Sequence, residues 1–191
     1  MTSKPLHIVI LAAGKGSRMR SDLPKVLHEV AGKPLLGHVI DSALELSPTQ
    51  IHIVVGHCKD LVIDAFSDHV ENATFNWVEQ TKQLGTGHAV SQALPYIEGE
   101  ADVLMLTADV PLIKSNTLSA MVESMPTHPL ALLTAIVADP FGLGRITRDE
   151  TNAVTGIVEQ KDASPEQQRI QEINSGIICA DKAHLQGWLA N

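Results

Sequence analysis

The sequence predicts an α/β fold, a mostly parallel central sheet flanked by helices, with a small β-rich part after it. Short apolar runs alternate with segments of helical spacing as far as Val137, and hairpin signals replace this alternation beyond it. Strands that alternate with helices form βαβ units with right-handed crossovers, which place the strands parallel to one another. The 191 residues suit one domain of ordinary size with a small appendage.

Five apolar runs are expected to be strands. They cover residues 7–12, 51–55, 74–78, 103–107 and 130–137. Four helices are expected between them, at 34–46, 60–66, 87–94 and 116–125. The first of these helices has apolar residues at positions 35, 36, 39, 40, 43 and 44, and Pro34 suits its first turn. Ser115 is expected to be the N-cap of the last one.

The alternation of predicted strands and helices ends after Val137. Residues 139–144 are expected to form a turn-rich hinge, and 145–148 and 153–158 to form a hairpin around the turn at 149–152. A short polar helix is expected at 164–170, a strand at 173–180 and a helix at 184–189. Because the helical pattern is still running at Asn191, we expect the chain to be a piece of a longer protein.

Composition argues against several classes of protein. The net charge of −8 disfavours a general nucleic-acid or anionic-membrane surface, and an aromatic content of 3% disfavours base-stacking platforms. The sequence has no signal-peptide pattern and no stretch of transmembrane length, so we expect a cytoplasmic protein with Cys58 and Cys179 reduced. The histidines show no metal-ligand spacing, and no serine has the spacing of a nucleophile elbow.

The most informative segment is LAAGKGSRM, residues 11–19, which follows the first strand and precedes Pro24 and Lys25. Glycines let backbone N–H groups approach a ligand, and Lys15, Arg18 and Lys25 bring positive charge to the same turn. The spacing matches neither the Walker loop nor the dinucleotide fingerprint. It predicts a site for a nucleoside triphosphate and its departing pyrophosphate. Arg18 is expected to bind the β- and γ-phosphates, and Lys25 to neutralise charge on the α-phosphate.

Two further motifs follow strands at their carboxyl ends, where ligands bind in an open parallel sheet. Asp109, in ADVPL (residues 108–112), can hold Mg²⁺ through a carboxylate oxygen. Gln80 offers an amide that suits the edge of a nucleobase. Gly85 and Thr86 offer unhindered backbone groups and a hydroxyl, although they suit a plain helix start equally well. Lys82 is expected to be solvated.

The small part supplies candidate groups for an acceptor sugar. Gly144 lies in a turn that could approach a sugar closely, Glu159 follows a predicted strand, and Asn174 opens the next one. A carboxylate and an amide suit sugar hydroxyls and an acetamido group. From residue type alone, however, ordinary structural roles explain these three residues better than sugar binding does.

With these motifs in place, the sequence resembles the uridylyltransferase domains of the bacterial bifunctional N-acetylglucosamine-1-phosphate uridylyltransferase/glucosamine-1-phosphate N-acetyltransferase family. LAAGKGSRM is shared with the wider sugar-nucleotide pyrophosphorylases. The other markers are SDLPKVLH, EQTKQLGTGHA, ADVPLI, DPFGLGRI, GIVEQKDA and QEINSGI. Among them, QLGTGHA, GLGRI, GIVEQKDA and EINSGI together are much narrower. The resemblance implies a Rossmann-like nucleotide-diphospho-sugar transferase fold that begins at Ile8 and has a small β-rich sugar-binding part.

The resemblance also implies an activity and a set of site residues. UMP would pass from UTP to N-acetylglucosamine 1-phosphate, giving UDP-N-acetylglucosamine, a cell-envelope precursor, and pyrophosphate. The implied nucleotide-binding residues are Leu11, Ala12, Ala13, Gly14, Lys25, Gln80, Gly85 and Thr86. The implied catalytic residues are Arg18, Lys25 and Asp109, with Asp109 as the Mg²⁺ ligand. The implied sugar-binding residues are Gly144, Glu159 and Asn174, together with Thr107 and Ala108, which depart from the residues usual in the family.

The resemblance places the family's second metal ligand, an Asn, beyond Asn191, together with a trimer-forming β-helix acetyltransferase domain. We therefore expect this chain to be a monomer with impaired Mg²⁺ binding and little turnover, and the whole protein to be a homotrimer. Two alternatives stay open. One is a related nucleotidyltransferase with another base or acceptor, such as a thymidylyltransferase or a molybdopterin cytidylyltransferase. The other is a non-catalytic nucleotide-sugar sensor.

Overall fold

The computed structural model describes residues 4–14, 16, 19, 21–56, 58–67 and 75–190. The chain forms two compact units: Met1–Ala131 with Ile178–Asn191, and Leu132–Ile177. The expected α/β class is confirmed, because the sheet of βαβ units lies in the first unit. The expected change to β-rich structure near Val137 is also confirmed, because the second unit is the β-rich part.

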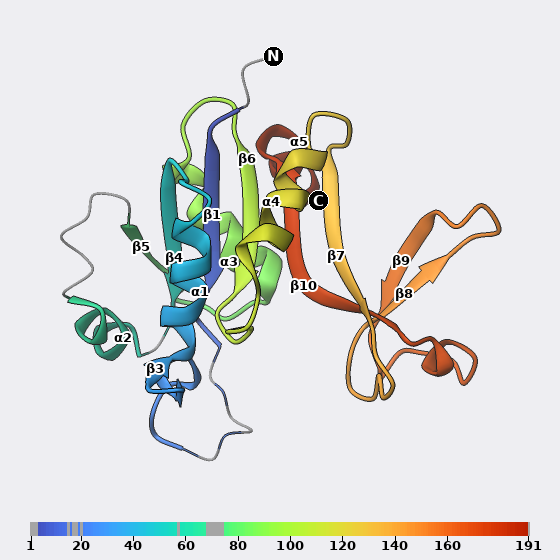
Figure 1. Ribbon diagram of the computed structural model, residues 1–191, viewed down its shortest axis with the longest axis horizontal. Helices are drawn as coiled ribbons and strands as arrows, with labels where there is room; N and C mark the ends of the chain where they lie inside the picture. The colour runs from blue at the N-terminus through green and yellow to red at the C-terminus, as the bar shows by residue number, and fades with distance from the viewer. Residues whose placement is uncertain are drawn as a thin grey trace. The chain divides into compact units, whose positions relative to one another are not determined.

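The first unit contains four parallel strands in the order β5–β4–β1–β6: β5 (Phe75–Glu79), β4 (Gln50–Val55), β1 (Leu6–Leu11) and β6 (Asp102–Thr107) (Figure 1). Ile8 of β1 pairs with Ile51 on one side and with Leu104 on the other. Residues 178–181 of β10 (Glu172–Asp181) add an antiparallel strand beside β6. The apolar runs are buried because helices cover both faces of a parallel sheet.

Alternate residues of β1 face opposite layers of helices. Val9 belongs to a buried cluster that includes Val90 of α3 (Thr86–Ala93) and Leu185 of α5 (Lys182–Leu189). Ile8 and Ile10 point to the other face by strand alternation. The helices α1 (Leu35–Leu44) and α4 (Ser115–Ser124) lie in front of the sheet in Figure 1, with α3 behind it. The short α2 (Lys59–Ala65) follows β4.

The helical spacing in 34–46 is confirmed, because α1 follows Pro34 and buries Leu36, Val39, Ile40 and Ala43 at intervals of three and four. The expectation for Ser115 is wrong. The N-cap of α4 is Lys114, and Ser115 is the first helical residue, whose hydroxyl donates to the carboxylate of Glu45 at the end of α1. The side chain of Ser115 therefore links α4 to α1 and does not cap α4.

Two small elements were not expected. Lys25–Leu27 form the 3₁₀ turn η2, and Glu29–Val30 (β2) pair with Lys33–Pro34 (β3) in a hairpin. Ala31 and Gly32 turn this hairpin with φ values of 53° and 76°, and Ala-Gly is a weaker turn signal than Asn-Gly. Leu94–Tyr96 (η4) extend α3 by a 3₁₀ turn. Of the strand expected at 74–78, residue 74 lies outside the described residues.

The second unit is antiparallel. β8 (Arg145–Arg148) and β9 (Val154–Val158) form the expected hairpin, with Arg145 opposite Val158 and Ile146 opposite Ile157. Ile173, in the first part of β10, pairs with Arg145. β7 (Leu130–Ile136) begins at the boundary of the unit and pairs with β10. The polar helix expected at 164–170 is reduced to the 3₁₀ turn η5 (Gln167–Arg169), which is too short to bury an apolar face.

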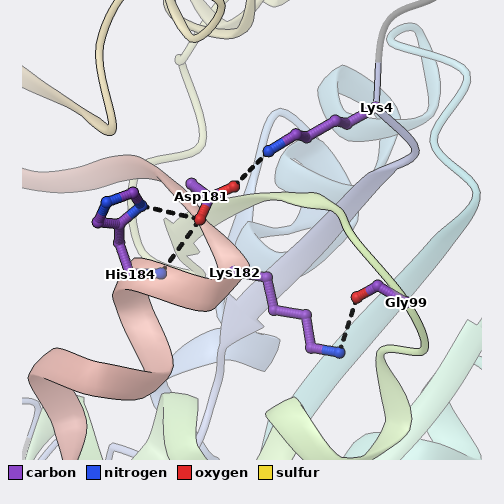
Figure 2. A network of polar contacts seen from close by, with 5 residues as sticks. All are labelled: Lys4, Gly99, Asp181, Lys182 and His184. Carbon is purple, nitrogen blue, oxygen red and sulfur yellow. Dashed lines mark hydrogen bonds and ion pairs between the residues drawn. The ribbon is translucent and has the colours of Figure 1, made fainter.

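Asp181 joins β10 to α5 through three contacts (Figure 2). One carboxylate oxygen accepts from the backbone N–H of His184 at 3.1 Å and lies 2.9 Å from its Nδ1, while the other lies 2.6 Å from Lys4 Nζ. Beside it, Lys182 Nζ donates to the carbonyl oxygens of Gly99 at 3.0 Å and of Ile97. Asp181 is thus the N-cap of α5 and ties the start of that helix to Lys4, which precedes β1.

Among the described residues, no helix combines the length and the apolar character needed to span a bilayer.

Candidate active site

A cavity of about 520 Å³ opens at the carboxyl ends of β1 and β6. The connections on the two sides of β1 run in opposite directions along the sheet, to β4 and to β6, so the cavity lies at a topological switch point. Its lining contains most of the predicted nucleotide-binding residues. The lining residues are Leu11, Ala13, Gly14, Gly16, Met19, Lys25, Val26, Gln80, Gln83, Gly85, Thr86, Ala89, Thr107, Ala108 and Asp109.

The loop after β1 forms one wall, and two backbone contacts fix its path. Ala12 N–H donates to the carbonyl of Val54 at 2.8 Å, and Ala13 C=O accepts from Gln83 Nε2 at 2.6 Å. Ala12 is itself buried and does not line the cavity, whereas Ala13 does. The loop therefore continues the path of β1 beside β4 for one residue and then turns over the cavity.

Gly16 is required where the loop meets Lys25. Its φ of +58° is rarely adopted by other residues, and a Cβ atom there would lie 2.7 Å from Lys25 Cβ. No real Cβ atom tolerates that distance. The glycine thus allows the loop to pass directly over the residue that supplies the site's described cation.

Lys25 and Asp109 meet at the mouth of the cavity. Lys25 Nζ lies 2.5 Å from Asp109 Oδ2, and both side chains are more than one third exposed, at 37% and 39%. The lysine is the first residue of η2, and the aspartate follows β6 by two positions. The structure therefore brings together two of the three predicted catalytic residues. The third, Arg18, lies outside the described residues, as does Lys15.

The residues present fit a Mg²⁺ ion that takes one protein ligand. Asp109 lines the cavity, and within the part of the chain that the structure describes only its Oδ2 has a partner, which leaves Oδ1 available as a metal ligand. The described residues contain no group of three or more His, Cys, Asp or Glu side chains that could hold a metal by themselves. Mg²⁺ characteristically binds one or two carboxylates and completes its shell with phosphate oxygens and water.

Gln80 also lines the cavity. Its side chain is 4% exposed, and its backbone N–H donates to Val55 C=O at 2.8 Å. The amide Nε2 donates to Gly85 C=O at 3.1 Å and lies 3.0 Å from His88 Nδ1. These contacts close the loop between β5 and α3, so that Gly85, at φ +105°, and Thr86 line the cavity at the start of α3. Lys82 is exposed, as expected.

Thr107 and Ala108 line the cavity at the end of β6. Ala108 N–H donates to Leu11 C=O at 3.1 Å, which holds the two strand ends side by side. The Oγ1 of Thr107 is buried and has no hydrogen-bond partner among the described residues.

The three sugar-binding candidates of the second unit lie close to one another. Asn174 N–H donates to Gly144 C=O at 2.9 Å. A Cβ atom at Gly144 would lie 3.2 Å from Glu159 Oε1. Asn174 also uses its side-chain oxygen to accept from Gly176 N–H at 2.9 Å. The carboxylate and amide thus lie beside one turn, in which a Cβ atom at Gly144 would be crowded by the side chains of Ile157 and Glu159.

Arg145 organises that turn and was not singled out in the sequence. It is 1% exposed, and its guanidinium donates to Gln160 Oε1 at 2.6 Å and to the carbonyl of Leu143. Gln160 Oε1 also accepts from Gly142 N–H at 3.1 Å. No carboxylate pairs with Arg145 among the described residues. Its position directly after Gly144 was the one available signal.

Gln83 is the other functional residue that the sequence did not reveal. Its amide links Ala13 of the first loop to the loop after β5, and both residues line the cavity. Its position inside EQTKQLGTG gave no way to distinguish it from the solvated Lys82 beside it.

Comparison with known proteins agrees with this geometry. Residues 8–154 match the family described as the MobA-like NTP transferase domain. This chain belongs to that family. The match covers β1 from Ile8 onward, β6 and the whole lining of the cavity. The MobA-like NTP transferase domain therefore includes the loop after β1, Lys25, Gln80 and Asp109.

Two curated relatives share more than half of their aligned residues with this chain. The chain is 54% identical over 185 residues to the bifunctional protein GlmU of Marinobacter nauticus, and 51% identical over 184 residues to that of Saccharophagus degradans. These alignments cover 97% and 96% of the chain but 40% of each relative. The NTP transferase domain described here thus spans about 40% of the length of the curated relatives it matches.

Among solved structures, a putative glucose-1-phosphate thymidylyltransferase from Bacillus anthracis, in complex with a sucrose, has a TM-score of 0.78 and 20% identity. The comparison covers 95% of this chain and 73% of that one. At this identity the likeness establishes that the two chains share the nucleotidyltransferase fold.

Proposed function

We propose that this NTP transferase domain transfers UMP from UTP to N-acetylglucosamine 1-phosphate, giving UDP-N-acetylglucosamine and pyrophosphate. The observation that carries the proposal is the juxtaposition of Lys25 and Asp109 at the switch point, in a cavity that Gln80 also lines. The cavity thus offers a cation for phosphates, a carboxylate that can hold a metal ion and an amide that can bind a base. The relatives named as bifunctional GlmU support a sugar phosphate as acceptor.

The phosphates of UTP would lie along the loop after β1. A glycine-rich loop presents backbone N–H groups to anions, and Lys25 adds a cation at the mouth of the same cavity. Arg18, which lies outside the described residues, is assigned to the β- and γ-phosphates because a guanidinium can bind two phosphate oxygens at once, and the family resemblance also gives it to the phosphates. Mg²⁺ held by Asp109 would supply charge stabilisation to the phosphate oxygens.

The chemical step needs no covalent intermediate on the protein. A phosphate oxygen of N-acetylglucosamine 1-phosphate attacks the α-phosphorus of UTP, and the bond between that phosphorus and the bridging oxygen to the β-phosphate breaks. The electron pair of the broken bond leaves with pyrophosphate. Lys25 would neutralise charge that builds on the α-phosphate oxygens, which is the main source of catalysis in phosphoryl and nucleotidyl transfer.

The acceptor sugar would be held by Gly144, Glu159 and Asn174, which the second unit gathers at one turn. The carboxylate of Glu159 can accept hydrogen bonds from sugar hydroxyls, and the absent side chain at Gly144 lets this carboxylate lie against the turn. Thr107 and Ala108 at the end of β6 are assigned to the same substrate by resemblance.

The test is pyrophosphate release from UTP and N-acetylglucosamine 1-phosphate with Mg²⁺. CTP and dTTP replace UTP in two controls, and glucose 1-phosphate replaces the acceptor in a third. Release that requires both UTP and N-acetylglucosamine 1-phosphate supports the proposal. Faster release with CTP or dTTP would reassign the nucleotide. Binding of UDP-N-acetylglucosamine without pyrophosphate release, in a chain extended beyond Asn191, would indicate a sensor instead.

A further inference from the structure

We propose that His88 is a positioning residue that sets the choice of base, because it fixes which atom of the Gln80 amide faces the nucleotide. The inference rests on the proposed function and deepens it. It depends on two contacts of the Gln80 amide nitrogen, one with the carbonyl oxygen of Gly85 and one with His88 Nδ1. Gln80 and Gly85 both line the cavity.

The orientation of the Gln80 amide follows from Gly85. A backbone carbonyl can only accept a hydrogen bond, so the amide atom 3.1 Å from Gly85 oxygen must be the nitrogen. The same carbonyl accepts from Ala89 N–H at 3.1 Å, which anchors it at the start of α3. The contact therefore removes the usual ambiguity between the oxygen and the nitrogen of a glutamine side chain.

The orientation of the amide in turn fixes the tautomer of His88. The second hydrogen of Gln80 Nε2 faces His88 Nδ1 at 3.0 Å. Since an amide nitrogen only donates, Nδ1 must carry the lone pair and the ring proton must lie on Nε2. Both hydrogens of the Gln80 amide are thus committed within the protein.

The atom of the Gln80 amide that stays available to a ligand is consequently its oxygen. Gln80 lines the cavity, and its Oε1 has no partner among the described residues. An acceptor in this position matches the N3–H of uracil. It opposes the N3 of cytosine, which is itself an acceptor. Because thymine also carries N3–H, this contact separates UTP from CTP and does not separate UTP from dTTP.

Loss of the acceptor at position 88 would free one amide hydrogen of a side chain that is 4% exposed. The amide would then keep a single fixed contact, and its oxygen would no longer be held toward the cavity. A site whose buried polar groups are mismatched to a ligand rejects that ligand strongly, and a site whose groups can rotate loses this power. His88 therefore contributes to discrimination without touching the nucleotide itself.

The first experiment measures the dissociation constants of UTP and CTP for the wild type, His88→Phe and His88→Asn. In His88→Phe the UTP-over-CTP preference should fall about tenfold or more. In His88→Asn an amide oxygen can take the place of Nδ1, so the preference should stay within about threefold of the wild type. Ser91→Ala is the matched control, because Ser91 lies on the same helix and donates only to the His88 carbonyl.

The outcomes separate the two proposals. A wild type that does not prefer UTP over CTP overturns the uridine assignment. A wild type that prefers UTP, with the preference intact in a folded His88→Phe variant, overturns the role of His88 alone. Equal loss in His88→Asn and His88→Phe would show that ring packing matters rather than the acceptor.

A second measurement needs no variant. Nitrogen NMR of the imidazole in the wild type at neutral pH should show His88 with the proton on Nε2. A proton on Nδ1 is incompatible with the Gln80 contact and would overturn the inference, whether or not His88→Phe folds.

Discussion

Lys25 Nζ lies 2.5 Å from Asp109 Oδ2, although 84 positions separate the two residues in the chain. The pair joins the turn that follows the glycine-rich loop to the end of β6. Each side chain neutralises the other at the site where we place the triphosphate. The pair therefore keeps the charges of the site compensated before the substrate binds. Binding of UTP would bring negative charge to Lys25 and leave Asp109 available for a metal.

Asp109→Asn should lower pyrophosphate release by about 10²-fold or more, because an uncharged amide supports the metal and the developing charge poorly. The free energy of unfolding should change by less than about 1 kcal/mol, since an exposed ion pair stabilises a protein little. Activity and urea unfolding of the same preparation check both statements.

Asp41→Asn is the matched control. Asp41 pairs with Lys33 on the exposed side of α1, away from the cavity lining. Its loss should leave pyrophosphate release unchanged. If Asp109→Asn and Asp41→Asn reduce activity equally, the Lys25–Asp109 pair has no part in the reaction.

Gly16→Ala should raise the KM for UTP about tenfold or more. The added methyl would lie 2.7 Å from Lys25 Cβ and would displace either the loop or the lysine. Gly99→Ala separates this clash from backbone strain, because Gly99 has a similar φ of +62° with nothing within 4 Å of an added Cβ. Both variants should be destabilised by about 1 kcal/mol or more through strain. An unchanged KM in Gly16→Ala would show that the loop does not bind the triphosphate.

Much of this site was predictable because strand ends can be recognised in the sequence. The apolar runs that became β1, β5 and β6 carry their polar residues at the carboxyl end, so Lys25, Gln80 and Asp109 were expected near one another. Apolar runs predict burial, and apolar strands that alternate with helices predict a parallel sheet covered on both faces.

Side-chain partners were not predictable in the same way. Ser115 has the residue type of an N-cap, yet Glu45 from another helix offers its hydroxyl a stronger, charged acceptor. Arg145 has the residue type of a surface cation, yet backbone carbonyls and Gln160 bury it. In both cases the deciding partner comes from a distant part of the chain, and sequence spacing does not report it.

The His52–His7 pair should make the fold sensitive to mild acid. The rings stack at 5.3 Å, and His7 Nδ1 lies 3.0 Å from His52 Nε2. Burial lowers the pKa of His52 to about 4, and burial together with Lys182 lowers the pKa of His7. The unfolded chain therefore takes up protons first, so this stability is complete above about pH 6.5 and declines toward pH 4.

The decline should amount to at most about 3 kcal/mol for His52, measured by urea unfolding between pH 7 and pH 4.5. In His52→Leu the free energy of unfolding should depend less on pH in this range. In His128→Gln, at an exposed histidine, the dependence on pH should stay as in the wild type. A His52→Leu profile as steep as that of the wild type would contradict the linkage.

Asp181 should make the stability of the fold depend on pH in a second, more acidic range. The hydrogen bond from Lys4 is the largest cause that holds its pKa well below the usual range, and the His184 contacts add to it (Figure 2). A depressed carboxyl pKa stabilises the fold above about pH 4, and the gain is lost as the pH falls further. Asp181→Ala should cost about 1 kcal/mol at pH 7 as a lost N-cap.

Asp181→Asn is the informative companion, because asparagine caps helices but cannot pair with Lys4 as a carboxylate does. It should be more stable than Asp181→Ala, and both should lose the dependence on pH below about 4. Equal stability of the two variants would mean that the cap contributes nothing. Asp162→Ala, at an exposed carboxylate, is the control.

Arg145→Met should affect the sugar phosphate more than the nucleotide. The variant leaves the Leu143 carbonyl and the Gln160 amide oxygen without their buried donor, which should destabilise the fold by about 1–3 kcal/mol. Because these contacts shape the turn at Gly144, the KM for N-acetylglucosamine 1-phosphate should rise about tenfold while the KM for UTP stays within twofold. Arg148→Met is the matched control, since Arg148 lies on the same strand and pairs with Glu172 at the surface. It should change neither KM, and an equal rise of both KM values in Arg145→Met would show general damage rather than a distorted sugar-binding turn.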